Sequence, residues 1–299
     1  MVVGAMRILV TNDDGVEAPG LAALAAGAAG AGHQVIVVAP DQNYSGASAA
    51  VGPVHEREGV AYERRTLDGL RLTSTDLQLE GIDVGLLDYI DAFAIDGPPA
   101  LAVILAGIGA FGPPPEMVLS GINHGANVGR SALHSGTVGA ALTAAQLGVS
   151  ALAVSIVYSE DPPPWGTPAH LGASLLDHLA AAPVPTVWNL NVPSLPLAKL
   201  SGARRGRLGR AGTIRSAVHH GPSHTHDGAH IPLELGPSGM LRLDLAIPAP
   251  SASADADTDA GLLYDGYVSL TALVGVHEAD PPEAPELSMG LSTLESILS

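Results

Sequence analysis

The stretch Arg7-Ile-Leu-Val-Thr-Asn-Asp-Asp-Gly15 decides the fold of this chain. Its apolar residues up to Thr11 form a short run that ends in a polar turn, which is typical of a buried parallel strand followed by a tight loop. Pro19 then opens an alanine- and leucine-rich helix that extends to about Gly30, since proline is tolerated in the first turn. A second apolar run follows over 34–39. Strand, helix and strand in this order predict a βαβ unit with a right-handed parallel crossover.

The same alternation continues along the chain. A strand is expected over 117–119, a helix over 136–147, and further strands over 151–157 and 187–190. The predicted fold is therefore α/β, a Rossmann-like, doubly wound and mostly parallel sheet. In such sheets ligands bind beyond the carboxyl ends of the strands, and the polar clusters of this sequence fall at those ends.

Beyond Pro196 the composition changes. Arginine is concentrated over 204–215 and histidine over 219–230, and a late strand is expected over 267–272. The Ala/Ser/Asp-rich stretch over 250–260 is typical of a loop, and a short helix is expected after a turn at 281–285. The histidines match no ligand spacing, which favours a solvated loop over a second metal site. The arginines either contact substrate phosphate or a partner subunit, or form an ordinary basic surface.

Composition and charge exclude several classes of protein. The 299 residues are 46% hydrophobic and 14% charged, which provides apolar material for a large core and excludes global disorder. The formal net charge of −17 leaves no general attraction to DNA or RNA polymers. The absence of cysteine excludes disulfides, thiolate metal sites and cysteine nucleophiles. No apolar run approaches the roughly 20 residues that span a bilayer, so a cytoplasmic protein that does not bind membranes is expected.

Two polar segments carry most of the chemical information. Asp13 and Asp14 are adjacent carboxylates, which raise each other's pKa unless a cation lies between them. Hard oxygen ligands of this kind suit Mg²⁺, Mn²⁺ or Ca²⁺, although a turn with a helix N-cap would also use them. Ser135-Gly-Thr137 opens a predicted helix, where free N–H groups and the helix dipole bind an anion. The alternative is simple capping of that helix by Ser135 or Thr137.

Loops 41–48 and 120–127 add hydroxyl and amide groups at the same edge, although each alone is an ordinary polar turn. His124 and His134 flank these loops and either take part in proton transfer or substrate contact, or only pack. Together the loops predict a hard divalent ion beside a helix N-terminus, which is a phosphoester site. Such a site would supply the local positive potential that an anionic substrate needs on this acidic chain.

Several motifs occur in the order and spacing of one known family. They are Arg7–Gly15 with Ala18-Pro-Gly20, Val38-Ala-Pro-Asp41, Ser45-Gly-Ala-Ser48, Ser120-Gly-Ile-Asn123, Ser135-Gly-Thr-Val138, Asn189-Leu-Asn-Val-Pro193 and Asp265-Gly-Tyr-Val-Ser269. Over residues 6–272 the chain therefore resembles the SurE family of survival-protein phosphatases. The motifs together are highly specific, whereas each one alone is not.

The resemblance implies a divalent-metal-dependent 5′/3′-nucleotidase, a phosphomonoesterase that hydrolyses nucleoside monophosphates or related small phosphate esters with a metal-activated water. The sequence itself indicates an N-terminal extension over 1–5, before Met6, a Rossmann-like core over 6–196, and a C-terminal β-rich, irregular extension over 197–299. The extension would carry oligomer contacts, substrate loops, a closing strand and a short helix. The resemblance further implies one Mg²⁺ or Mn²⁺ per subunit, with Ca²⁺ able to replace it in a crystal, and a homodimer or homotetramer.

The resemblance also assigns roles to individual positions of this sequence. The metal ligands that it implies are Asp13, Asp14, Ser45 and Asn123. The phosphate- or substrate-binding residues that it implies are Asn12, Gly46, Ser135, Gly136 and Thr137. The candidates for proton transfer or substrate contact are Asp14, His124 and His134.

The sequence departs from the family pattern around these positions. Gly97-Pro-Pro-Ala100 stands where the family has Gly-Thr-Pro, and Thr143 stands where a glutamate is common. His124, Ala126 and His134 also differ, and 204–230 lacks the usual family stretch. The changes spare the implied metal ligands but alter their surroundings, which keeps a repurposed, non-catalytic binder of a phosphorylated ligand as the alternative. A glycosyltransferase-like Rossmann protein is less favoured, because the chain beyond Pro196 is too short for a second Rossmann domain.

Overall fold

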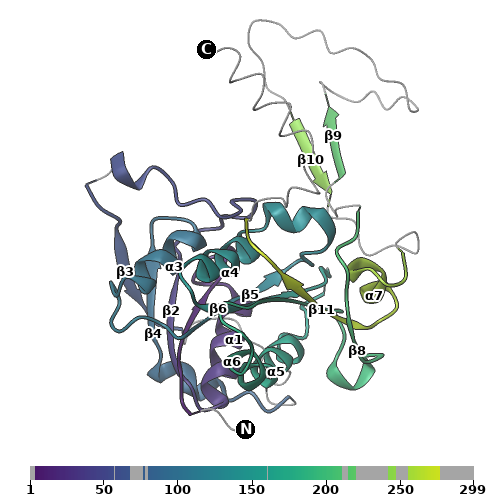
Figure 1. The fold of residues 1–299 in the computed structure, drawn as a ribbon, viewed down its shortest axis with the longest axis horizontal. Helices are drawn as coiled ribbons and strands as arrows, with labels where there is room; N and C mark the ends of the chain where they lie inside the picture. Colours follow the sequence, from purple (N-terminus) through teal and green to yellow (C-terminus); the bar gives the residue numbers. More distant parts are fainter. Residues whose placement is uncertain are drawn as a thin grey trace, which may run out of the picture.

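The computed structural model describes residues 4–56, 58–67, 77, 80–159, 161–210, 215–219, 242–246 and 255–276. In this part of the chain a nine-stranded sheet has the order β3-β4-β2-β1-β5-β6-β7-β11-β8, and β9 and β10 form a separate two-stranded ribbon (Figure 1). The strands are β1 (Arg7–Thr11), β2 (Gln34–Pro40), β3 (Tyr62–Arg65), β4 (Asp91–Ile95), β5 (Met117–His124), β6 (Ser150–Ile156), β7 (Val187–Val192), β8 (Ala203–Arg205), β9 (Arg215–His219), β10 (Arg242–Ala246) and β11 (Val268–Leu273).

Helices connect the strands and cover both faces of the sheet. The α-helices are α1 (Pro19–Gly30), α3 (Pro99–Gly107), α4 (Gly136–Gln146), α5 (Gly166–Ser174), α6 (Leu176–Ala180) and α7 (Asp259–Tyr264). The 3₁₀ helices are η1 (Val54–Glu56), η2 (Val84–Tyr89), η3 (Gly129–His134) and η4 (Leu197–Lys199). No helix in the described ranges has both the length and the apolar character that crossing a bilayer requires.

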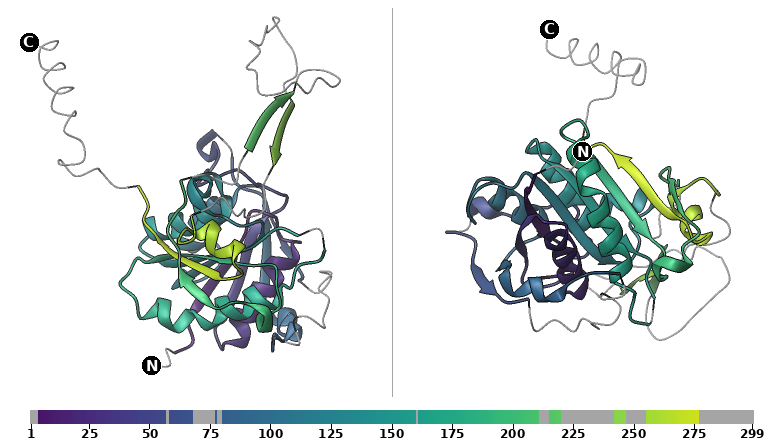
Figure 2. Two further views of the ribbon diagram at one scale, coloured as in Figure 1. Left: turned by 90° about the vertical axis from the view of Figure 1, so that its right-hand side faces the viewer. Right: turned by 90° about the horizontal axis from the view of Figure 1, so that it is seen from below.

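Strand β1 shows why the sheet lies between two layers. Successive side chains of a strand point to opposite faces, so Ile8 and Val10 pack with α1, α5 and α6, whereas Leu9 packs with α3 and α4. All three side chains are fully buried. A strand covered on both faces is continuously apolar, which explains the uninterrupted Ile-Leu-Val run that the sequence shows. The predicted α/β, Rossmann-like fold is confirmed, and Figure 2 shows the two helical layers from further directions.

The register of the central strands brings the polar loops to one edge. Strand β1 is parallel to β2 on one side and to β5 on the other, with Val10 opposite Val37 and Thr11 opposite Ser120. The loops that follow β1 and β2 and the last residues of β5 therefore meet at the carboxyl edge of the sheet. Gly20 of α1 allows this edge to close, because a Cβ atom there would lie 2.2 Å from the carbonyl oxygen of Ile122.

The C-terminal part of the chain completes the same sheet. Strand β11 is antiparallel to β7, with Ser269 opposite Asn191, and β8 is parallel to β11. The late strand expected over 267–272 therefore exists and lies next to the last parallel strand of the core. Strands β9 and β10 pair with each other in antiparallel fashion, and Figure 2 shows their ribbon projecting away from the sheet.

Some local expectations are corrected by the structure. The loop expected over 250–260 is wrong in its last residues, because Thr258 caps α7 by accepting a 3.2 Å hydrogen bond from the N–H of Gly261. Strands β3 and β4 and helices α3 and α5 were not predicted from the sequence. The short helix expected after 281–285, and the histidines over 220–230, lie outside the described residues.

Candidate functional site

Asp13 belongs to the turn after β1, and its side chain lies against the N-terminus of α4. The hydroxyl of Thr137 donates a 2.5 Å hydrogen bond to its Oδ1, and a Cβ atom on Gly136 would lie 2.8 Å from its Oδ2. Asp13 is 3% exposed. Burial raises the pKa of its carboxyl, whereas the hydroxyl of Thr137 and the backbone N–H groups of Thr137 and Gly136 lower it. The helix terminus therefore holds a buried carboxylate in a fixed position.

Asp14 places a second carboxylate beside the first. Its Oδ2 accepts a 3.4 Å hydrogen bond from the N–H of His124, and its Oδ1 accepts one of 3.5 Å from Nδ2 of Asn43. Burial, and then the charge of Asp13, raise the pKa of Asp14 to about 6. Two carboxylates that disfavour each other's charge are the arrangement that a bound cation stabilises.

The turn after β1 aims these two carboxylates. Asn12 is fully buried, and its amide both donates to the carbonyl of Gly15 at 3.0 Å and accepts from the Gly15 N–H at 3.2 Å. Gly15 has a φ of +105°, a conformation that side chains with a Cβ atom rarely adopt. The side chain of Asn12 therefore holds the turn in this structure. Its implied contact with phosphate stays a prediction.

The loop after β2 packs directly on this turn and on α4. The N–H of Tyr44 donates to the carbonyl of Asp13 at 2.7 Å, and Ser48 Oγ donates to the carbonyl of Leu133 at 2.6 Å. A Cβ atom on Gly139 would lie 2.2 Å from the carbonyl oxygen of Ser48, so only glycine allows this close approach. Ser45 and Gly46, the implied metal and phosphate residues, are exposed in this loop immediately after Tyr44.

The end of β5 contributes Asn123 and His124. The amide nitrogen of Asn123 donates to the carbonyl of Gly125 at 2.6 Å, which leaves the amide oxygen as the atom that can face a cation. His124 stacks on Tyr158 with 4.7 Å between ring centroids and meets Trp165 edge-on at 5.6 Å. Its Nε2 accepts a 3.4 Å hydrogen bond from the N–H of Ser159, and burial lowers its pKa. The neutral, packed imidazole is therefore favoured.

Ser135 and His134 occupy the junction between η3 and α4. The hydroxyl of Ser135 accepts a 3.1 Å hydrogen bond from the N–H of Val138, so the capping role that the sequence left open is present. Its implied contact with phosphate stays a prediction. His134 is exposed at the end of η3, and its backbone carbonyl accepts from the N–H of Ser48 at 3.2 Å. Residues 134–137 are thus held by the loop after β2 and by Asp13.

Several residues that the sequence reasoning missed fix the segment between β5 and α4. The carbonyl of Asn127 accepts from Asn189 at 2.8 Å and from Asn191 at 3.1 Å, and its side chain donates to Ser155 at 2.9 Å. Asp259 accepts from the N–H of Gly129 at 2.7 Å. The alternating asparagines of the Asn189-Leu-Asn191 motif were a signal, because buried polar side chains on a strand must find partners.

Two of the arginines over 204–210, Arg204 and Arg207, make their contacts at the edge of the sheet and not at this site. Strand β8 is the last strand of the sheet, with β6, β7 and β11 between it and β5. Arg207 forms an ion pair with Asp257, and Arg204 lies over the ring of Tyr267 with its guanidinium carbon 4.0 Å from the centroid. Among the described residues these arginines therefore serve the edge of the sheet rather than the carboxylate pair.

The donor set of the site suits a hard divalent cation. In the described ranges no group of three or more histidine, cysteine, aspartate or glutamate side chains is placed to hold a metal. A cation at this edge would instead take the carboxylates of Asp13 and Asp14, the amide oxygen of Asn123 and the hydroxyl of Ser45. Mixed oxygen donors of this kind fit Mg²⁺ or Mn²⁺.

The chain is similar over most of its length to a family model, to named proteins and to a solved structure. Residues 8–214 match the family model described as survival protein SurE. The chain is 35% identical over 270 residues to a 5′-nucleotidase SurE of Aeromonas hydrophila, with 90% of this chain and 92% of that protein covered. It is 36% identical over 270 residues to the 5′-nucleotidase SurE of Legionella pneumophila strain Paris, with 90% of each chain covered. The crystal structure of a SurE protein from Aquifex aeolicus superposes with a TM-score of 0.63 at 25% identity, covering 90% of this chain and 93% of that one.

Proposed function

This chain belongs to the survival protein SurE family, and from that premise we propose that it is a divalent-metal-dependent 5′-nucleotidase. The proposed substrates are nucleoside 5′- or 3′-monophosphates and related small phosphate esters. The observation that carries the proposal is the pair of carboxylates, Asp13 and Asp14, held against the N-terminus of α4. The two relatives described above, whose alignments cover 90% of this chain, are named 5′-nucleotidases, which supports the same reaction class.

Four side chains would hold the metal. They are Asp13, Asp14, Ser45 and Asn123, from the ends of β1 and β5 and the loop after β2. When bound, Mg²⁺ or Mn²⁺ supplies Lewis-acid stabilisation of the negative charge on the phosphoryl oxygens and favours attack by water. Burial, and then the charge of Asp13, raise the pKa of Asp14 to about 6, which supports this role because a bound cation would favour the charged form of both carboxylates.

The substrate phosphate would lie between the carboxylate pair and the start of α4. Its proposed contacts are Asn12, Gly46, Ser135, Gly136 and Thr137. The free N–H groups of a helix N-terminus bind anions, and here they lie beside the proposed cation. Positive potential is thereby concentrated at one point of a chain whose net charge is −17.

His124, His134 and Asp14 are the proposed groups for proton transfer or substrate contact. The exposed His134 is accessible to a substrate held at the start of α4. His124 uses Nε2 to accept from Ser159, so a neutral ring carries its proton on Nδ1. Burial and the charge of Asp13 raise the pKa of Asp14 to about 6, so this carboxylate can accept a proton from water.

The proposal also covers the location, the oligomeric state and the partners of the protein. The protein would act in the cytoplasm, as a homodimer or homotetramer, on small phosphorylated molecules rather than on DNA, RNA or membranes. A glycosyltransferase reading loses support, since the described chain builds one large sheet and has no second Rossmann domain.

The test is phosphate release from AMP and from p-nitrophenyl phosphate with Mn²⁺ or Mg²⁺. We expect Asp13→Asn and an excess of EDTA each to abolish it, because both remove the proposed cation. Full activity of Asp13→Asn, or activity that EDTA leaves unchanged, would contradict the proposal. Binding of nucleotide by the wild-type protein without any turnover would instead favour the alternative, a non-catalytic binder.

A further inference from the structure

Asp259 is a buried carboxylate far from the metal site in sequence but connected to it in space. Its side chain is fully buried and accepts three backbone hydrogen bonds, from Gly129 at 2.7 Å, from Gly209 at 3.0 Å and from Ala260 at 2.9 Å. It forms no ion pair with a cation in the part of the chain that the structure describes. A charged group without a counter-ion in this position relies on those N–H donors.

We propose that Asp259 is a positioning residue for the phosphate-binding start of α4. The inference rests on the proposed function and names a residue that the motif assignments do not contain. Asp259 contacts neither the carboxylate pair nor the proposed phosphate residues. It acts through η3, the single 3₁₀ helix that leads from Gly129 to His134 and is followed directly by Ser135.

The contacts form a short path from Asp259 to the site. Oδ2 of Asp259 holds the N–H of Gly129, which is the first residue of η3 and has a φ of +58°. At the other end of η3, the N–H of Ser135 donates to the carbonyl of Ala132 at 3.2 Å, and Ser135 caps α4. A shift of Gly129 would therefore move the residues that present Ser135, Gly136 and Thr137.

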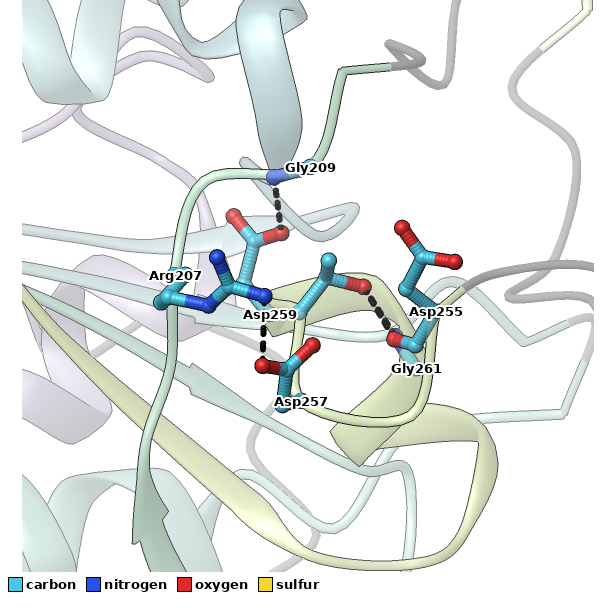
Figure 3. Close-up of polar contacts among 7 residues, drawn as sticks. Arg207, Gly209, Asp255, Asp257, Asp259 and Gly261 are labelled. Carbon is cyan, nitrogen blue, oxygen red and sulfur yellow. Dashed lines mark hydrogen bonds and ion pairs between the residues drawn. The ribbon is translucent and has the colours of Figure 1, made fainter.

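The opposite face of Asp259 is anchored independently of Gly129. Oδ1 accepts from Gly209, as Figure 3 shows, and from Ala260. Thr258 closes the first turn of α7 by accepting from Gly261 and donating to the carbonyl of Asp255 at 2.6 Å. The ion pair between Arg207 and Asp257 lies beside this turn, as Figure 3 shows. Helix α7 and the segment after β8 thus form a fixed base from which one oxygen reaches Gly129.

Because Oδ1 and Oδ2 of Asp259 hold different segments, one substitution can remove the bond to Gly129 alone. In Asp259→Asn the amide oxygen is expected to keep the two donors at the Oδ1 position, which leaves an NH₂ group facing the N–H of Gly129. The matched control is Thr258→Ala, which removes the cap of α7 but keeps the carboxylate and its bond to Gly129. Thr258→Ala weakens α7 and leaves Gly129 anchored, whereas Asp259→Asn releases Gly129 and with it η3.

Steady-state kinetics with AMP and inhibition by inorganic phosphate test the link. We expect Asp259→Asn to raise both KM for AMP and Ki for phosphate by about 10-fold to 150-fold, the range of one lost hydrogen bond to a charged group. We expect Thr258→Ala to lower Tm without changing KM or Ki. Unchanged KM and Ki in Asp259→Asn would overturn the inference, as would equal changes in both variants.

Hydrogen exchange separates this inference from the proposed function. If the wild-type protein releases no phosphate, the proposed function fails, but amides 129–138 should still exchange faster in Asp259→Asn and not in Thr258→Ala. Equal exchange in the two variants would overturn the inference. If Asp259→Asn does not fold, hydrogen exchange of the wild-type protein in low denaturant tests the inference instead. Amides 129–135 are then expected to become exchangeable together with those of α7, and opening of the two segments independently of each other would overturn the inference.

Discussion

The hydrogen bond between Thr137 and Asp13 offers the most direct test of how the helix terminus serves the proposed metal site. Thr137→Val removes the hydroxyl and keeps the shape of the side chain. Thr137 is fully buried, Asp13 is 3% exposed, and the bond between them is 2.5 Å long. The hydroxyl lowers the pKa of Asp13, so its removal lets burial raise that pKa further.

The size of the effect follows from the charge of the acceptor. A hydrogen bond to a charged group contributes about 1.5–3 kcal/mol, which corresponds to about 10-fold to 150-fold in a binding constant. We therefore expect the Kd for Mn²⁺ to rise by about that factor in Thr137→Val. The loss should grow as pH falls, because protons compete with the cation for a carboxylate of raised pKa.

Isothermal titration calorimetry with Mn²⁺, together with phosphate release from AMP, measures this loss. The matched control is Thr143→Val on the same helix, since Thr143 is also buried but donates to the carbonyl of Gly139 at 2.7 Å, away from Asp13. Thr143→Val should bind Mn²⁺ like the wild-type protein. Wild-type affinity in Thr137→Val, or an equal loss in both variants, would refute the role given to the helix terminus.

Three further predictions concern pH and packing. The pKa of about 6 for Asp14 predicts that Mn²⁺ affinity falls as pH drops through 6, since only the carboxylate binds. Calorimetric titrations from pH 5 to 8 measure this, and a flat profile would contradict it. The same raised pKa makes ionisation of Asp14 destabilising, so Tm of the metal-free protein should fall as pH rises from about 4 to 6. Gly20→Ala should lower the free energy of unfolding by roughly 1–3 kcal/mol through overpacking, because its Cβ atom would lie 2.2 Å from the carbonyl oxygen of Ile122. The control is Gly59→Ala, whose Cβ atom meets no other atom within 4 Å. Equal Tm values for the two variants would contradict this prediction.

Local signals in the sequence predicted the centre of the molecule well. The apolar run before Gly15 and the proline at position 19 defined β1 and the start of α1, because each reflects the chemistry of its own residues. The strand-end polar clusters likewise predicted that Asp13, Asp14, Asn123 and Thr137 belong to one edge. Hydrogen bonds from the ends of β5 and α4 to the two carboxylates confirm that these segments meet.

The features that the sequence did not predict depend on contacts between distant segments. Helix α3 begins at the second of two consecutive prolines and is buried over most of its length, so it lacks the alternation of polar and apolar residues that marks a surface helix. Helix α7 begins inside an Ala/Ser/Asp-rich stretch, where only the hydrogen bond that the N–H of Gly261 donates to Thr258 distinguishes a cap from a loop. The link from Asp259 to Gly129 has no local signature, since neither residue type implies the other.

The distances along the chain between these partners have a consequence for protein synthesis. Asp13 is hydrogen-bonded to a residue 124 positions later, Asp14 to one 110 positions later, and Gly129 to one 130 positions later. A nascent chain that has left the ribosome up to β2 holds both carboxylates but none of these partners. Asp13 lacks its hydrogen-bond donor until Thr137 of α4 emerges, and η3 gains its anchor only when Asp259 is made. The site is thus one of the last parts of the molecule to be completed during translation.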